Sequence, residues 1–200
     1  MSGGLQIAIL AAGEATRFGA TKLDTEIAGK ALGCWALESA LALDPARLIV
    51  IVPSKVPAFA RMAAEAGRTT LIVNPDATGG LSTSVATAAA DAAGAGSDVL
   101  LLMLADMPAV SPETLRLLVA RVSAGGPSAV RHGSGSAGIP ACFPSDYFEA
   151  LQALEGDRGA AVLLRGAPGL QLIDAGADEL GDVDTLDDLT TVARTLTRRS

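Results

Sequence analysis

Short runs of consecutive apolar residues are the feature of this sequence that most restricts its fold. They cover residues 6–11, 48–52, 71–73 and 99–105, and a glycine, proline, asparagine or aspartate follows each run closely. Runs of this length are too short for membrane helices, which need about 20 apolar residues. They are typical of strands that are buried on both faces, as in a parallel sheet between layers of helices.

The segments between these runs have helical periodicity. Apolar residues recur at helical spacing in 32–43 and in 56–63. Ser111 followed by Pro112 is a typical helix start, and Gly125 stops the pattern that follows. The apolar stripe of this third helix consists of Leu115, Leu118, Val119 and Val122. Alternating strands and helices predict βαβ units, and hence an α/β fold with a mostly parallel sheet.

The second half of the chain is less regular. Residues 125–140 are rich in glycine and serine and are expected to form a loop. Strands are expected at 139–143 and 170–173, with a helix at 147–154 between them. Thr185 can cap a last helix, whose apolar residues are Leu186, Leu189, Ala193 and Leu196. There is no internal repeat, so residues 1–200 are expected to form a single domain.

Composition excludes several classes of function. The net charge of −7 and the aromatic content of 3% argue against a nucleic-acid partner. Cys34 and Cys142 form no metal-binding or disulfide pattern. Neither a signal peptide nor a membrane span is apparent, so we expect no membrane partner and a cytoplasmic location.

The segment from Leu10 to Lys22, directly after the first run, has the composition of a phosphate-binding loop. Gly13 and Gly19 let the backbone pass close to a ligand, while Arg17 and Lys22 offer charge to phosphate oxygens. The segment contains neither a Walker A motif nor the dinucleotide pattern GxGxxG. From spacing alone, an ordinary strand-to-helix turn with two solvated cations is an equally good interpretation.

A second segment with the composition of a binding site begins at Asn74. Asn74 begins a stretch of small residues in which Gly80, Ser82 and Ser84 would allow a flat base to approach. The alternative for Ser82 is that it caps a helix that begins near Val85.

Asp106 follows the most apolar run and can hold Mg²⁺ through its carboxylate. The alternative is an aspartate that starts a turn before Pro108.

The order of these segments resembles the nucleotidyltransferase family that includes the molybdopterin cytidylyltransferases and guanylyltransferases. The family loop LAAGxSxRMGxxK is matched at Gly13, Arg17, Gly19 and Lys22, whereas Glu14, Ala15 and Phe18 depart from it. The stretch from Asn74 to Val85 is similar to the family's NP…GxxxS segment. The stretch from Ala105 to Pro108 is similar to its GDMP motif, and that from Asp182 to Asp188 to DIDTPEDL.

This resemblance implies a three-layer αβα sandwich with a Rossmann-like nucleotidyltransferase fold. It implies transfer of CMP from CTP to a phosphate of molybdopterin, with release of pyrophosphate. Mg²⁺ would be held by Asp106 and Asp184, and Arg17, Lys22 and Asp106 would be the catalytic residues. The nucleotide would be bound by Leu10, Ala11, Ala12, Gly13, Gly19, Lys22, Asn74, Gly80, Ser82, Ser84 and Asp106. For Asp184, the alternative is an acid at the positive end of the last helix.

The acceptor site is expected around two weaker matches. Gly138 and Pro140 resemble the ends of the family's GHP motif, with Ile139 in place of its histidine. Asp157 and Arg158 resemble its GDRGAR stretch, although a surface loop is an equally good interpretation of these two residues. His132, the sole histidine, is expected to be an exposed loop residue.

Ala12 favours CTP, because alanine at this position resembles the cytidylyltransferase branch of the family, whereas the guanylyltransferase branch usually has glycine there. Two alternatives remain open. One is a sugar-1-phosphate nucleotidyltransferase. The other is a non-catalytic carrier that binds a nucleotide or the molybdenum cofactor and delivers it to a molybdoenzyme or its chaperone. The presence of both Asp106 and Asp184 argues against a carrier.

Overall fold

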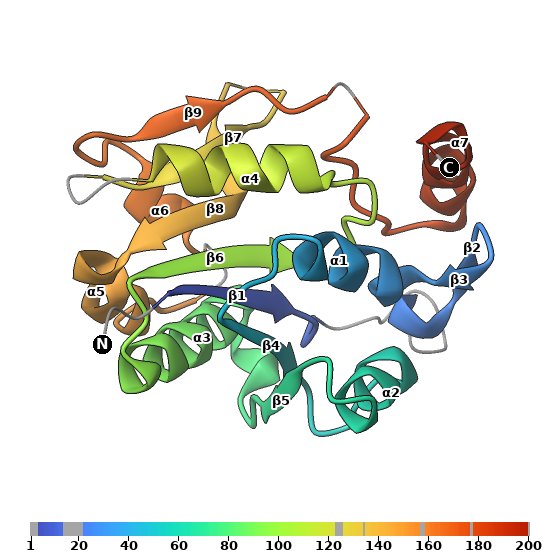
Figure 1. Cartoon of the computed structure of the whole chain (residues 1–200), viewed down its shortest axis with the longest axis horizontal. Coiled ribbons are helices and arrows are strands. Elements are labelled where there is room, and N and C mark those ends of the chain that lie inside the picture. Colours follow the sequence, from blue (N-terminus) through green and yellow to red (C-terminus); the bar gives the residue numbers. More distant parts are fainter. Residues whose placement is uncertain are drawn as a thin grey trace.

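A computed structural model describes residues 4–13, 22–122, 126–133, 135–156, 159–176 and 178–199 of the chain. Its centre is a seven-stranded sheet in the order β5-β4-β1-β6-β8-β7-β9 (Figure 1). The strands are β1 (Leu5–Leu10), β4 (Arg47–Val52), β5 (Thr70–Val73), β6 (Val99–Leu104), β7 (Ser128–Arg131), β8 (Ala137–Pro144) and β9 (Gln171–Ile173). A separate hairpin consists of β2 (Glu26–Ile27) and β3 (Lys30–Ala31). Only β8 runs antiparallel to its neighbours, which confirms a mostly parallel sheet.

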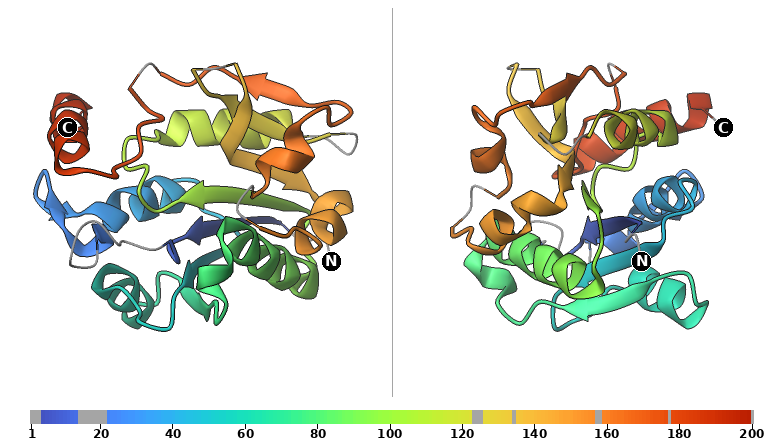
Figure 2. Two further views of the ribbon diagram at one scale, coloured as in Figure 1. Left: turned by 180° about the vertical axis from the view of Figure 1, so that it is seen from behind. Right: turned by 60° about the vertical axis from the view of Figure 1, so that its left-hand side comes forward.

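Helices cover both faces of the sheet, as the runs of apolar residues predict. They are α1 (Leu32–Leu41), α2 (Ala58–Glu65), α3 (Leu81–Ala95), α4 (Pro112–Arg121), α5 (Phe148–Gln152), α6 (Ala161–Leu164) and α7 (Leu186–Arg199). Three short 3₁₀ helices lie at Lys22–Asp24, Ala77–Gly79 and Ser145–Tyr147. Helices α1 and α3 lie on opposite sides of the central strands (Figure 2). The three-layer α/β arrangement is therefore confirmed.

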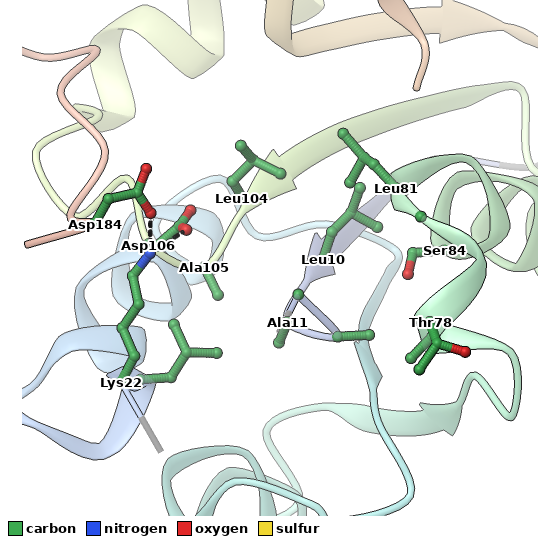
Figure 3. Close-up of a pocket in the computed structure, with 15 residues that line it drawn as sticks. Leu10, Ala11, Lys22, Thr78, Leu81, Ser84, Leu104, Ala105, Asp106 and Asp184 are labelled. Atoms are coloured by element: carbon green, nitrogen blue, oxygen red, sulfur yellow. Dashed lines mark hydrogen bonds and ion pairs between the residues drawn. The ribbon is translucent and has the colours of Figure 1, made fainter. Parts of the chain in front are cut away.

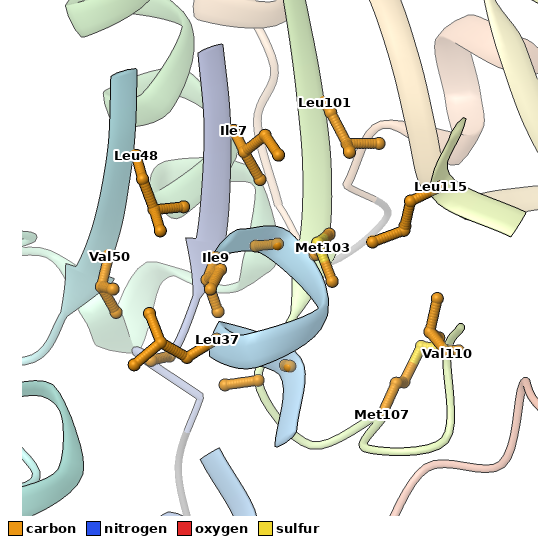
Figure 4. Packing of buried hydrophobic residues seen from close by; sticks show 14 of the residues in the cluster. Ile7, Ile9, Leu37, Leu48, Val50, Leu101, Met103, Met107, Val110 and Leu115 are labelled. Atoms are coloured by element: carbon orange, nitrogen blue, oxygen red, sulfur yellow. The ribbon is translucent and has the colours of Figure 1, made fainter. Parts of the chain in front are cut away.

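Alternate residues of the central strands belong to two separate cores. Ile7 and Leu101 face α1, α2 and α4 (Figure 4), whereas Ala8 and Leu102 face α3, α5 and α6. Both faces of β1 and β6 are therefore buried, and this is why β6 is wholly apolar and β1 is apolar apart from Gln6, which is buried and hydrogen-bonded to Asp91 and Ser97. None of the described helices has the length and apolar character that a membrane crossing requires.

Two expectations about the strands were wrong. The segment 125–140 was expected to be a loop, but its described residues include β7 and the start of β8, which pair as a hairpin. The hydroxyl of Ser128 is fully buried and donates to the Leu118 carbonyl at 2.6 Å, so this polar residue is accommodated in a buried strand. Strand β5 is not buried on both faces. It lies at the sheet edge, where Val73 is 48% exposed.

The helix starts are largely as predicted. Ser111 caps α4 by accepting a hydrogen bond from the Thr114 amide, with Pro112 at the first helical position. Thr185 precedes α7, and its hydroxyl accepts from the Asp188 amide at 3.3 Å. The alternative in which Ser82 caps a helix that begins near Val85 was wrong, because this helix, α3, already begins at Leu81.

Leu101→Ala tests the contribution of the core between β6 and α4. Leu101 is fully buried, so we expect a loss of about 2–5 kcal/mol in the free energy of unfolding. Leu117→Ala is the matched control, because Leu117 is 47% exposed on α4 and should change stability by less than about 0.5 kcal/mol. Urea unfolding of both variants measures the difference, and equal losses would contradict this description of the core.

Candidate active site

A cleft of about 420 Å³ lies at the carboxyl ends of β1 and β6 (Figure 3). It brings together many of the residues singled out in the sequence, namely Leu10, Ala11, Ala12, Gly13, Lys22, Gly80, Ser84, Asp106 and Asp184. Reasoning from sequence missed Leu23, Ala77, Thr78, Leu81 and Leu104, which also line the cleft. The carboxyl edge of parallel strands is where open α/β sheets bind their ligands.

Lys22 is the centre of the charged end of the cleft. Its ammonium donates hydrogen bonds to Asp106 Oδ2 at 2.9 Å and to Asp184 Oδ1 at 2.7 Å. Asp106 and Asp184 lie 84 and 162 residues after Lys22 in the sequence, so the fold brings three distant segments together here. Only 8% of Lys22 is exposed, so its charge depends on these two partners.

The ion pairs shift the pKa values of Lys22 and Asp184. Burial acts to lower the pKa of Lys22, but hydrogen bonds and charge attraction from Asp184 and Asp106 outweigh it, and the pKa is raised above 10.5. The hydrogen bond from Lys22 lowers the pKa of Asp184 below its ordinary value of 3.8. Both groups are therefore charged at neutral pH.

Backbone hydrogen bonds hold the two carboxylates near each other. The amide of Val183, which is fully buried, donates to the Asp106 carbonyl at 3.0 Å. Asp188 accepts from the amides of Asp184 and Thr185, at 3.0 and 2.7 Å. Asp188 therefore caps the start of α7, as its position at the positive end of a helix indicates, and Asp184 is directed to the cleft.

The donor set is suited to a divalent cation that also contacts a ligand. Among the described residues, no three acidic, histidine or cysteine side chains form a cluster that could enclose a metal ion. Two carboxylates on one side of an open cleft match Mg²⁺, which usually takes one or two protein carboxylates together with water and substrate phosphates.

The opposite end of the cleft is built from small residues at the start of α3. Gly80 precedes the helix with φ of 94°, a conformation that disfavours any side chain. No side-chain hydrogen bond caps α3, and Thr78 and Ser84, which both carry a hydroxyl group, line this end of the cleft (Figure 3). This end therefore offers hydrogen-bond donors to an uncharged ligand group.

Two residues of the predicted nucleotide site do not line the cleft. Asn74 is buried and donates to Thr83 Oγ1 and Ser84 Oγ, while its own oxygen accepts from the Asp76 amide. Asn74 thus holds the loop in place. Ser82 is also buried, and its hydroxyl has no hydrogen-bond partner in the described part of the chain. Arg17, Gly19, Glu14 and Ala15 lie outside the described residues, as do Asp157 and Arg158.

A second cavity of about 210 Å³ adjoins the cleft across Leu81 and Leu104, which line both. The other residues that line it are Met107, His132, Ile139, Ala160, Ala161, Leu180 and Asp182. Gly138 and Pro140 are buried in β8 and do not line this cavity, whereas Ile139 between them does. The three residues lie where the register between β7 and β8 shifts, between the pairs Ala129 with Ala141 and Val130 with Gly138.

His132 lies between β7 and β8, as a loop residue should, but the expectation that it is exposed was wrong. His132 is half-buried, and its Nε2 lies 3.1 Å from the Ile139 carbonyl oxygen. Its ring packs on Gly138 so closely that a Cβ there would lie 2.7 Å from the ring. The hairpin of β7 and β8 produces this contact, and the interpretation of 125–140 as a loop concealed it.

Lys22→Met tests the ion pairs through their pH dependence. The lowered pKa of Asp184 means that the stabilisation is present above about pH 4 and is lost as the pH falls through the folded-state value. The variant should therefore be less stable than the wild type at pH 7, and the deficit should shrink towards about pH 3.5. Urea unfolding across this range measures the deficit. Lys55→Met, at an exposed lysine, is the control, and a deficit independent of pH would contradict the prediction.

Comparison with known proteins identifies the family. Residues 7–175 match the model of the MobA-like NTP transferase domain. The purine catabolism protein PucB of Bacillus subtilis is 30% identical, over 94% of this chain and 95% of its own length. The structure of Rv0371c from Mycobacterium tuberculosis is 25% identical, with a TM-score of 0.78 over 97% of this chain and 99% of that one. Rv0371c has also been solved with manganese, where the identity is 24% and the TM-score 0.73 over 97% of this chain and 100% of that one.

A nucleotidyl transferase of Methanothermobacter, Mth528, has the same fold. It is 20% identical, with a TM-score of 0.84 over 98% of this chain and 99% of that chain. The family match covers the described loop after β1, the start of α3 and the end of β6, which form the cleft. The chain belongs to the MobA-like NTP transferase family of nucleotidyltransferases.

Proposed function

We propose that this protein transfers CMP from CTP to a phosphate of molybdopterin and releases pyrophosphate. The observation that supports this most directly is the convergence of Lys22, Asp106 and Asp184 at one end of the cleft, with small residues at the other end. In the orientation that we propose, the phosphates of the nucleotide lie at Lys22 and its base lies at Gly80, since both residues line the cleft. We also propose that the reaction takes place in the cytoplasm.

The chain's own groups suffice to position the reaction. An oxygen of the acceptor phosphate attacks the α-phosphorus, and the bond to the bridging oxygen breaks as pyrophosphate leaves. The Lys22 ammonium neutralises charge on the α-phosphate, and Arg17 and the amides near Gly13 hold the outer phosphates. No protein nucleophile is required, since positioning and charge neutralisation dominate such transfers.

Asp106 and Asp184 would hold the divalent cation, which we take to be Mg²⁺. When bound, this cation neutralises the triphosphate and polarises it as a Lewis acid. The same two carboxylates form ion pairs with Lys22, at 2.9 and 2.7 Å. Binding of the nucleotide therefore exchanges one set of partners for another. Lys22 moves to the phosphates, and the carboxylates become available to the metal.

The start of α3 would select the base. Its uncapped amides and the Ser84 hydroxyl can donate to the carbonyl oxygen of a pyrimidine. Ala12 lines the same cleft, and its methyl group leaves less room than the glycine of the guanylyltransferase branch. Both features favour CTP over GTP.

The second cavity would receive the body of the acceptor. Its apolar residues suit the flat ring system of molybdopterin, and Asp182 offers a hydrogen-bond acceptor at the edge. The cavity adjoins the cleft at Leu81 and Leu104, so an acceptor bound there can direct its phosphate towards the nucleotide. Gly138, Pro140, Asp157 and Arg158 would then support this site rather than form all of its surface.

Pyrophosphate release with each of the four nucleotides, with and without molybdopterin, tests the proposed function. We expect release with CTP, molybdopterin and Mg²⁺, and at least about 100-fold less with Asp106→Asn, which removes one carboxylate charge from the metal site. Asp187→Asn is the matched control, because Asp187 is exposed in the first turn of α7. Release with a sugar 1-phosphate would favour a different acceptor. No release under any condition would favour a carrier protein.

Ala161→Trp tests the acceptor site. An indole at this position would fill part of the second cavity, so the KM for the acceptor should rise about tenfold or more while the KM for CTP stays unchanged. Val162→Trp is the control, because the adjacent Val162 is 43% exposed and does not line the cavity. Equal effects of the two substitutions on the acceptor KM would contradict this location.

A further inference from the structure

Glu179 is a buried carboxylate in the segment between β9 and α7, and it lines neither cavity of the site. Its oxygens accept hydrogen bonds from the Thr114 hydroxyl at 2.6 Å, the Ser111 hydroxyl at 3.1 Å and the Ser111 amide at 3.2 Å. All three donors belong to the start of α4. A buried carboxylate is costly unless it is well hydrogen-bonded, so these contacts define where this segment lies.

The same segment leads directly to the candidate metal ligand. Four residues after Glu179, the amide of Val183 donates to the Asp106 carbonyl at 3.0 Å, and Asp184 follows. In the segment that connects β6 to α4, Asp106 and Ser111 are five residues apart. The two segments are therefore joined at two points, Glu179 with the start of α4 and Val183 with Asp106.

The fit around the Glu179 carboxylate is close. The backbone amide of Glu179 donates to the Gly176 carbonyl at 3.0 Å, and this hydrogen bond closes a turn. A Cβ on Gly176 would lie 2.9 Å from Glu179 Oε1, so a side chain there would have to displace the carboxylate. The turn and the start of α4 thus hold this side chain from two sides.

We propose that Glu179 is a positioning residue for Asp184. It fixes the segment from Glu179 to Val183, so that the Asp184 carboxylate lies at the same end of the cleft as Asp106. This inference rests on the proposed function, in which these two carboxylates hold the metal. Glu179 is not required to cap α4, because Ser111 Oγ already accepts from the Thr114 amide. Loss of the Glu179 carboxylate should therefore affect the position of Asp184 more than the stability of α4.

Binding of Mn²⁺, followed by electron paramagnetic resonance in the presence of a non-hydrolysable CTP analogue, tests this role. We expect Glu179→Ala to raise the apparent Kd for Mn²⁺ about tenfold, with affinity for the analogue alone unchanged. The kcat at low Mn²⁺ should fall and be partly restored at high Mn²⁺, which a purely structural defect would not show. Glu179→Gln keeps one accepting oxygen, so its effect should be smaller, and it serves if the alanine variant fails to fold.

Asp174→Asn is the matched control, because Asp174 begins the same connection but pairs with Arg131 at 2.8 Å, away from the start of α4. It should leave Mn²⁺ binding unchanged. The inference is overturned if both Glu179 variants bind Mn²⁺ like the wild type while Asp106→Asn and Asp184→Asn weaken binding. If neither Asp106→Asn nor Asp184→Asn affects Mn²⁺ binding, the proposed metal site itself is wrong.

Discussion

The site depends on the parallel pairing of β1 with β4 and β6. Hydrogen bonds continue past the strand ends, because the Ala11 amide donates to the Ile51 carbonyl at 2.8 Å and the Ala105 amide to the Leu10 carbonyl at 3.0 Å. The loop after β1 and Asp106 therefore begin side by side, although more than 90 residues separate them in the sequence. Burial on both faces fixes this register, since a shift of one residue would exchange the two cores.

On this framework, ion pairing determines the arrangement of side chains at the charged end of the cleft. A buried ammonium and two carboxylates satisfy one another in a chain whose net charge is −7. A nucleotide adds negative charge where Lys22 lies, and a metal adds positive charge where the carboxylates lie. In our proposal, the nucleotide draws Lys22 away from the two carboxylates, which can then bind the metal, and the metal in turn frees Lys22 for the nucleotide. The two ligands therefore favour each other's binding.

The irregular second half of the chain completes the site through specific contacts. The hairpin of β7 and β8 extends the sheet and brings His132 and Ile139 beside the second cavity. The connection to α7 brings Asp184 to the cleft through the Val183 hydrogen bond and the buried Glu179. Specific polar contacts position these parts in addition to their apolar packing, in which Val183, Val192 and Leu196 join a buried cluster.

The sequence by itself determined the α/β class, the buried central strands and the family, because uninterrupted apolar runs and ordered motifs are local patterns. It also indicated Gly13, Lys22, Gly80 and Asp106, which do line one cleft. Only the tertiary structure decided that Asn74 supports its loop, that Ile139 rather than its neighbours faces a cavity, and that Lys22 lies between two carboxylates. The physical reason is that these properties arise from contacts between segments distant in sequence, and no local pattern records them.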